Sequence, residues 1–221
     1  MYFAILFFLE LLILFLLSKN LTNHLFNFFY STTKSKNVSI YLMGLLFLPG
    51  TVIHELSHMF MAILLQVPVG NMELIPKLSG ENLKLGSVQI AKSDPVRRAL
   101  IGMAPFLFGT TIIIGIFFYI SKNNLFNNQL IIFFLAYLVF EIGNTMFSSK
   151  KDMEGALELI FVISIIITIL FLIGFRLPAL NPNVFFSNPV VFQTFEKGSI
   201  YLAVPIGIDL IVIALLKLIR H

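Results

Sequence analysis

The sequence predicts an all-α membrane protein, a single domain of about six transmembrane helices with a small β-hairpin between the second and the third. Of the 221 residues, 58% are hydrophobic and only 12% are charged, which is about half the charged share of an ordinary soluble domain. The mean hydropathy is +0.94. Several apolar runs also approach the ~20 residues that a helix needs to cross a hydrocarbon core of about 30 Å.

Composition also limits the chemistry that the chain can perform. There is no cysteine, so disulfides and thiolate metal ligands are excluded, and any metal must be held by His, Asp or Glu. The net charge of +4 is spread over the connections without a basic block, which gives no support for nucleic-acid binding. The lysines and arginines are better placed to flank membrane spans.

Six apolar segments are candidate spans. The first ends where Ser18 begins a polar stretch, and Pro49 and Gly50 interrupt the second, where a proline inside a span is expected to kink the helix. No Lys or Arg precedes the first segment and no cleavage pattern follows it, so we expect a span there, not a signal peptide. The six segments are residues 2–17, 38–67, 98–120, 130–147, 157–175 and 200–218.

All six spans are expected to form one polytopic domain, residues 1–221. The motifs described below fall in a core at about residues 38–159, and the spans at residues 2–17 and 200–218 are peripheral. Lys and Arg residues are more numerous on the side that would hold the hairpin and both termini than on the other side. The positive-inside rule therefore favours a cytoplasmic position for that side, which is also the side expected to hold the motifs described below.

The connection at residues 68–94 has a different pattern from the spans. Alternating stretches at residues 72–75 and 83–90 surround Gly80 and Asn82. Two extended runs separated by Gly and Asn are typical of a β-hairpin. A surface loop with apolar anchors is the alternative interpretation.

The strongest chemical signal is His54-Glu55-Leu56-Ser57-His58 in the second span. Two histidines four residues apart project from one face of a helix and can bind one Zn²⁺. Glu55, beside the first histidine, is placed to act as the general base toward a zinc-activated water. Two His and one Glu inside a lipid-embedded segment would cost several kcal/mol unless they are paired or ligated.

A catalytic zinc takes three protein ligands and leaves one position open. His24 lies in a polar connection and His221 is terminal, and Glu10 and Asp209 are single acids in outer spans, better explained by pairing or snorkelling than by ligation. The segment 141–152 remains, where helical spacing aligns one polar stripe that must face the bundle interior or water. The stripe consists of Glu141, Asn144 or Thr145, Ser148 and Asp152.

On these residues the sequence resembles the site-2 protease family of intramembrane zinc metalloproteases, over about residues 38–159. The resemblance rests on the His54–His58 motif, the hairpin segment that follows it, Arg97-Arg98 before Ala104-Pro105, and the separation of eight residues between Asn144 and Asp152. The two prolines of the family pattern are absent around Asn144, and the glycine expected directly after Asp152 is displaced to Gly155. The resemblance is therefore to a divergent member.

The resemblance implies a function and a set of roles. His54, His58 and Asp152 would hold one Zn²⁺ per chain, Glu55 would be the catalytic base, and Asn144 would contact the substrate or the oxyanion. The reaction would be hydrolysis of a peptide bond in or near a transmembrane segment of a membrane protein substrate, at a site within the bilayer.

Two other functions remain open from the residues alone. In the first, Glu141 is the third zinc ligand and the enzyme cuts outside the hydrocarbon core; on a straight helix Glu141 lies about 16 Å deeper than Asp152 at 1.5 Å per residue. In the second, the chain is a zinc-binding membrane scaffold or transporter without proteolytic activity. Glu55 favours an enzyme, because a structural zinc site has no use for a base.

Overall fold

The fold comes from a computed structural model, which describes residues 2–79, 82–123, 128–147, 161, 164–170, 172–173 and 188–219. The expected mostly helical architecture with one small hairpin region is confirmed. The helices are α1 (Tyr2–Thr33), α2 (Lys36–Leu46), α3 (Leu48–Leu64), α4 (Pro95–Lys122), α5 (Gln129–Thr145) and α8 (Pro189–Ile219).

Three described helices, α1, α4 and α8, are long and apolar enough to cross a membrane, and the bent pair α2 and α3 makes a fourth candidate. This supports a membrane protein, but the described part of the chain does not reach the expected six spans. α5 is apolar but shorter. The fifth expected span, residues 157–175, lies mostly outside the described residues, although residues 164–170 are helical.

α1 is longer than expected, because it continues to Thr33 instead of ending near residue 17. Its sequence holds no Gly or Pro, and Ser, Lys and Asn do not by themselves end a helix. Ser18 is buried, whereas Lys19 and Asn20 are exposed, so the polar residues turn outward without breaking the helix. A helix of 32 residues is about 48 Å long, well beyond a ~30 Å core.

α8 also begins earlier than expected, at Pro189 and not at residue 200. Its first turns pack on the start of α1, where Phe7 and Phe195 meet edge to face at a centroid distance of 5.5 Å. A Cβ on Gly198 would lie 2.9 Å from the Phe7 ring, so glycine allows this close approach.

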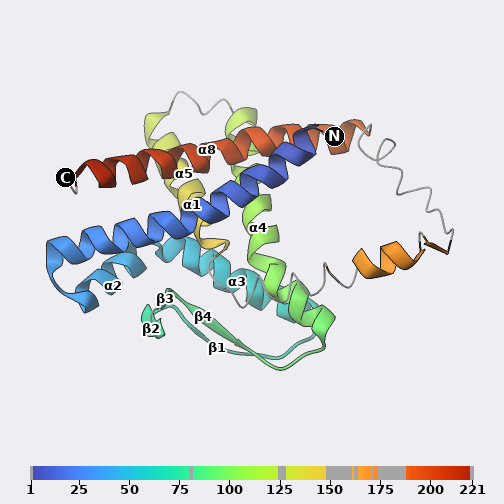
Figure 1. The fold of residues 1–221 in the computed structure, drawn as a ribbon, viewed down its shortest axis with the longest axis horizontal. Helices are drawn as coiled ribbons and strands as arrows, with labels where there is room; N and C mark the ends of the chain where they lie inside the picture. The colour runs from blue at the N-terminus through green and yellow to red at the C-terminus, as the bar shows by residue number, and fades with distance from the viewer. Residues whose placement is uncertain are drawn as a thin grey trace.

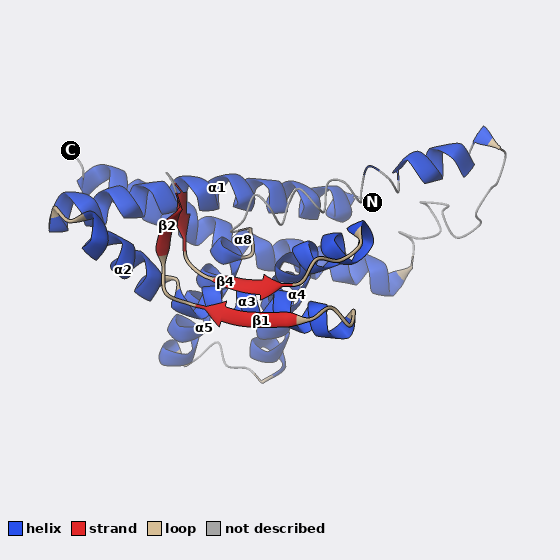
Figure 2. Ribbon diagram, turned by 90° about the horizontal axis from the view of Figure 1, so that it is seen from below, coloured by secondary structure: helices blue, strands red, loops and turns tan. Residues whose placement is uncertain are grey.

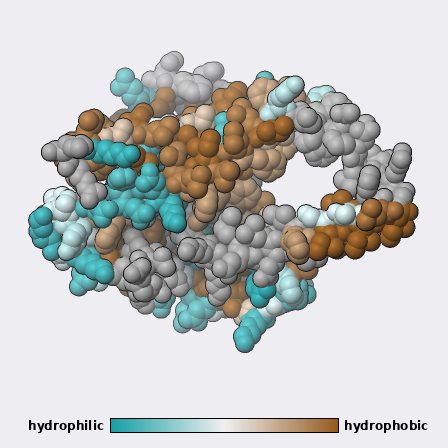
Figure 3. All heavy atoms as spheres, in the orientation of Figure 1, coloured by the Kyte–Doolittle hydropathy of each residue, from teal (hydrophilic) through white to brown (hydrophobic). Residues whose placement is uncertain are grey.

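α1 and α8 lie side by side and run in the same direction (Figure 1). Phe3 meets Phe192 at one end of the pair, and Leu21 and Leu25 share an apolar cluster with Ile213 at the other. In Figure 3, apolar residues dominate α8 and the first half of α1, and hydrophilic residues gather along the second half of α1. α4 and α5 complete the core beneath this pair.

The hairpin is confirmed as an antiparallel structure, with boundaries that differ from the expected ones. β1 (Val69–Glu73) pairs with β4 (Ser87–Ile90), and at the far end β2 (Lys77–Ser79) pairs with β3 (Asn82–Lys84). Seen from below, the β1–β4 ribbon runs along α3 (Figure 2). The hairpin therefore follows the helix that carries His54 and His58.

The expected interruption of the second span is also present. α2 ends at Leu46, α3 begins at Leu48, and the two helices are bent by 69°. Pro49 lies in the first turn of α3, where its missing N–H costs no helical hydrogen bond. The segment His54 to His58 thus lies on a helix of its own, separate from α2.

Candidate metal centre

α3 turns the three motif side chains to the interior. His54, Glu55 and His58 are 5%, 6% and 5% exposed, whereas Leu56 between them is 38% exposed. The helical repeat explains this pattern, because positions i and i+4 lie one above the other on the same face. The face expected from the sequence is the buried one.

The two imidazoles converge on one point. Nε2 of His54 and Nε2 of His58 are 3.2 Å apart. Two nitrogens bound tetrahedrally to one zinc at 2.0–2.1 Å would be about 3.3 Å apart. The spacing is that of a hydrogen bond between the two rings, and it also matches the separation of two ligands on a single zinc ion.

His58 is oriented by a backbone group of α4. Its Nδ1 lies 2.7 Å from the carbonyl oxygen of Ile101. A carbonyl only accepts hydrogen bonds, so Nδ1 carries the hydrogen and donates it. In the neutral ring Nε2 of His58 then carries no hydrogen, and it faces Nε2 of His54 across the 3.2 Å hydrogen bond between the two rings. Metal-binding histidines are commonly oriented in this way.

Glu55 lies against the backbone that leads into β4. A Cβ built on Gly86 would lie 3.1 Å from Cγ and from Oε1 of Glu55, and 2.7 Å from Cγ2 of Thr51. Any side chain at position 86 would push against these atoms. The hairpin therefore approaches the carboxylate as bare backbone.

The polar stripe of α5 faces the interior, as expected, for its described members Glu141, Asn144 and Thr145, all of which are at most 5% exposed. A Cβ on Gly50 would lie 2.6 Å from the Glu141 carbonyl oxygen and from Oγ1 of Thr145. Gly50 precedes His54 by four residues, about 6 Å along α3. The end of α5 thus packs one turn away from the first histidine.

Asn144 has both of its amide hydrogens committed. Nδ2 donates to the carbonyl oxygen of Phe140 at 2.9 Å and to Oδ1 of Asp209 at 2.7 Å. Oδ1 of Asn144 is buried without a hydrogen-bond partner among the described residues. The expected contact of Asn144 with substrate or oxyanion remains a prediction; in this geometry the side chain offers an acceptor.

Two residues that the sequence left outside the site take part in this polar cluster. Asp209 is fully buried and accepts a hydrogen bond from Asn144. A paired acid was expected at this position, and its partner lies in the core. Ser18 donates to the carbonyl oxygen of Asn144 at 2.7 Å. The available signal was an acid inside an apolar span, which normally marks a functional or paired position.

The described residues place no third acidic or histidine side chain beside His54 and His58 in a metal-binding arrangement. In that part of the chain, no group of three or more His, Cys, Asp and Glu side chains is arranged to hold a metal ion. Glu141 therefore does not join His54 and His58 here. Asp152 and Ser148 lie outside the described residues.

Comparison of the chain with protein-family models, with curated proteins and with solved structures finds no match. The functional argument consequently rests on the residues and on their geometry.

Proposed function

We propose that this chain is a zinc metalloprotease of the membrane, which hydrolyses a peptide bond in or near a transmembrane segment of a protein substrate. The observation that carries the proposal is the pair of Nε2 atoms, 3.2 Å apart, on a buried helical face that also holds Glu55. Three ionisable groups in an apolar helix are costly unless they serve a metal or a reaction.

The residues have separate roles in this proposal. His54 and His58 hold the metal, with Asp152 as the third ligand. Bound zinc would supply Lewis acidity, polarising the scissile carbonyl and lowering the pKa of a water ligand. Glu55 accepts a proton from the attacking water and returns it to the leaving amine.

The hairpin offers a way to hold the substrate. A helical segment hides its carbonyl groups in hydrogen bonds, so it must unwind before attack. Among the described residues the β1–β4 ribbon has two strands, and an extended segment can add to an open strand edge through backbone hydrogen bonds. Because Gly86 lies beside Glu55, a strand added along β4 would pass close to the base.

We further propose that the protein crosses the membrane several times, with the hairpin side in the cytoplasm. The hydropathy of α1, α4 and α8 supports several crossings. The orientation is supported by the basic residues in and directly after the hairpin, which are Lys77, Lys84, Lys92, Arg97 and Arg98.

The first prediction tests the division of roles in the motif. Glu55→Gln should retain zinc and lose proteolysis by a factor on the order of 10²–10⁴, because Gln resembles Glu in shape but is not a base. His54→Ala and His58→Ala should lose both zinc and activity. The measurements are zinc content of the purified protein and cleavage of a library of fluorogenic peptides that carry a transmembrane segment, in detergent micelles.

His24→Ala is the matched control, because this histidine lies on α1 outside the motif, and it should change neither quantity. Undiminished cleavage by the Gln variant would show that Glu55 is not the base. Stoichiometric zinc in the wild type without cleavage of any peptide would favour the zinc-binding scaffold.

A further inference from the structure

The Ile101 carbonyl is available to His58 because of the residue that follows it by one helical turn. In a regular α-helix the carbonyl of residue 101 accepts the N–H of residue 105. Residue 105 is a proline inside α4, and proline has no N–H to donate. The helix thus leaves one carbonyl without its regular partner, and His58 Nδ1 lies 2.7 Å from this oxygen.

Small residues bring the two helices close enough for this bond. Ala104 and Ala62 are fully buried, and Ala62 packs with Ile101 in one apolar cluster. Ala62 lies one turn beyond His58, on the same face of α3. His58 is itself only 5% exposed, so its Nδ1–H needs an acceptor from the protein, and the Ile101 carbonyl supplies one.

We propose that Pro105 is a positioning residue for the metal centre: by withholding an N–H, it frees the Ile101 carbonyl to hold His58 in the Nδ1–H tautomer, with Nε2 turned toward His54. The role of the centre in catalysis rests on the function proposed above, whereas the tautomer and its cause concern the chain alone. Pro105 touches neither metal nor substrate in this account and acts through His58.

The chain contains a matched control. Pro205 is likewise a buried proline inside a long apolar helix, α8, and it packs against Gly143 of α5, away from the two motif histidines. Pro105→Ala and Pro205→Ala restore the same N–H to a helix interior. A general effect of straightening a helix would appear in both variants, and a specific effect on His58 only in the first.

The first measurement is the tautomer of His58 in the zinc-free protein, by ¹⁵N NMR of labelled histidine at a pH where the ring is neutral, with His58→Gln to assign the signal. We expect the Nδ1–H form in the wild type and in Pro205→Ala, and an increased Nε2–H population in Pro105→Ala. An Nε2–H tautomer in the wild type would overturn the proposal without any variant.

The second measurement is zinc affinity, by competition with a chelator. Loss of a group that orients a ligand typically weakens metal binding by about 10–100-fold, and we expect this for Pro105→Ala and not for Pro205→Ala. Equal affinities for wild type and Pro105→Ala would overturn the proposal. Neither measurement uses proteolysis, so a failure of the proposed function would appear separately, as zinc binding without cleavage.

Discussion

At the residue scale, one cluster of buried polar groups is held together by hydrogen bonds between three helices. Asn144 of α5 receives a hydrogen bond on its carbonyl from Ser18 of α1 and gives one to Asp209 of α8. In an apolar layer each of these groups would otherwise lack a hydrogen-bond partner, which costs several kcal/mol of free energy. The three residues therefore tie the end of α5 to both outer helices.

The second prediction concerns this pair. A double-mutant cycle with Asn144→Ala and Asp209→Ala should give a coupling free energy of roughly 0.6–1.7 kcal/mol in reversible unfolding, the range for hydrogen bonds between membrane helices. Asn123→Ala is the matched control. Nδ2 of Asn123 donates to the carbonyl oxygen four residues earlier at 2.9 Å, as Nδ2 of Asn144 does, but Asn123 lies on the surface. Additive effects of the two substitutions at 144 and 209 would contradict a direct pair.

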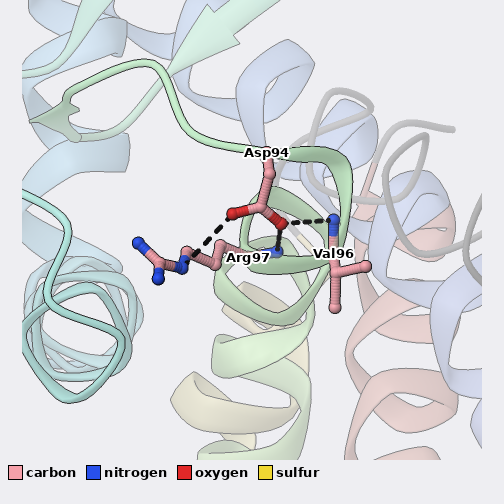
Figure 4. A network of polar contacts seen from close by, with 3 residues as sticks. All are labelled: Asp94, Val96 and Arg97. Atoms are coloured by element: carbon pink, nitrogen blue, oxygen red, sulfur yellow. Dashed lines mark hydrogen bonds and ion pairs between the residues drawn. The ribbon is translucent and has the colours of Figure 1, made fainter.

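The third prediction concerns the start of α4, where Asp94 caps the helix (Figure 4). Oδ1 accepts the backbone N–H groups of Val96 and Arg97 at 3.1 and 3.0 Å, and Oδ2 lies 3.2 Å from Nε of Arg97. The backbone N–H of Arg97, chiefly, and the charge of its guanidinium hold the pKa of Asp94 below its ordinary value of 3.8. A lowered folded-state pKa stabilises the cap above the ordinary value, and this contribution is lost as the pH falls through the folded pKa.

Hydrogen exchange of the Val96 and Arg97 amides should therefore accelerate, relative to the intrinsic rate, when the pH falls below about 4. Asp94→Asn retains an acceptor oxygen but does not titrate, so its protection should be lower and nearly independent of pH in this range. Protection in the wild type that stays constant down to pH 2 would contradict the cap.

At the element scale, the break between α2 and α3 is stabilised from α5. A continuous helix would join the Leu46 carbonyl to the Gly50 N–H, and among the described residues no such backbone bond is formed. The hydroxyl of Tyr137 instead donates to the Leu46 carbonyl at 2.7 Å.

The fourth prediction follows from this arrangement. Tyr137→Phe should lower the free energy of unfolding by about 0.5–1.5 kcal/mol, the usual value of one hydrogen bond, and should widen the distribution of angles between α2 and α3. Tyr119→Phe is the control, because Tyr119 is 57% exposed.

The chain has no cysteine, so spin labels on cysteines introduced at Tyr41 of α2 and Ile63 of α3, both exposed, would report this angle as a distance distribution. An unchanged distribution and stability in Tyr137→Phe would show that α5 does not hold the break.

At the scale of the whole molecule, the parallel packing of α1 and α8 differs from the expected topology. Six alternating crossings make the first and last spans antiparallel and place both termini on one side. The observed pair runs in one direction: Phe3 meets Phe192 at one end, and Leu25 and Ile213 belong to one apolar cluster at the other. If both helices cross the membrane, the two termini lie on opposite sides.

The fifth prediction is the corresponding labelling pattern. Single cysteines at Tyr2 and Lys217 should react with an impermeant reagent from opposite sides of sealed vesicles. Ser93 and Asn123 flank the two ends of α4 and should also label from opposite sides, which controls for a helix that crosses once. Labelling of Tyr2 and Lys217 from the same side would support an even number of crossings.

The local features of the fold and the site were predictable from the sequence. The hydropathy of the long helices, the kink at Pro49, the hairpin and the common face of His54 and His58 all follow from patterns within one turn or one short segment. The extent of α1 was not predictable from polarity, because Ser18 finds its partner in Asn144, which is 126 residues away. The role of Asp152 stays a prediction.

The sequence by itself determined that the chain is suited to an apolar environment. It also determined that one helix presents two imidazoles and a carboxylate to the interior of the protein. Only the tertiary structure decided which groups meet these side chains: the Ile101 carbonyl at His58, Gly86 at Glu55, Asp209 at Asn144, and α8 parallel to α1. The reason is that a sequence pattern reports the neighbours along a helix or strand, whereas a free carbonyl or a buried acid acquires its partner from another element.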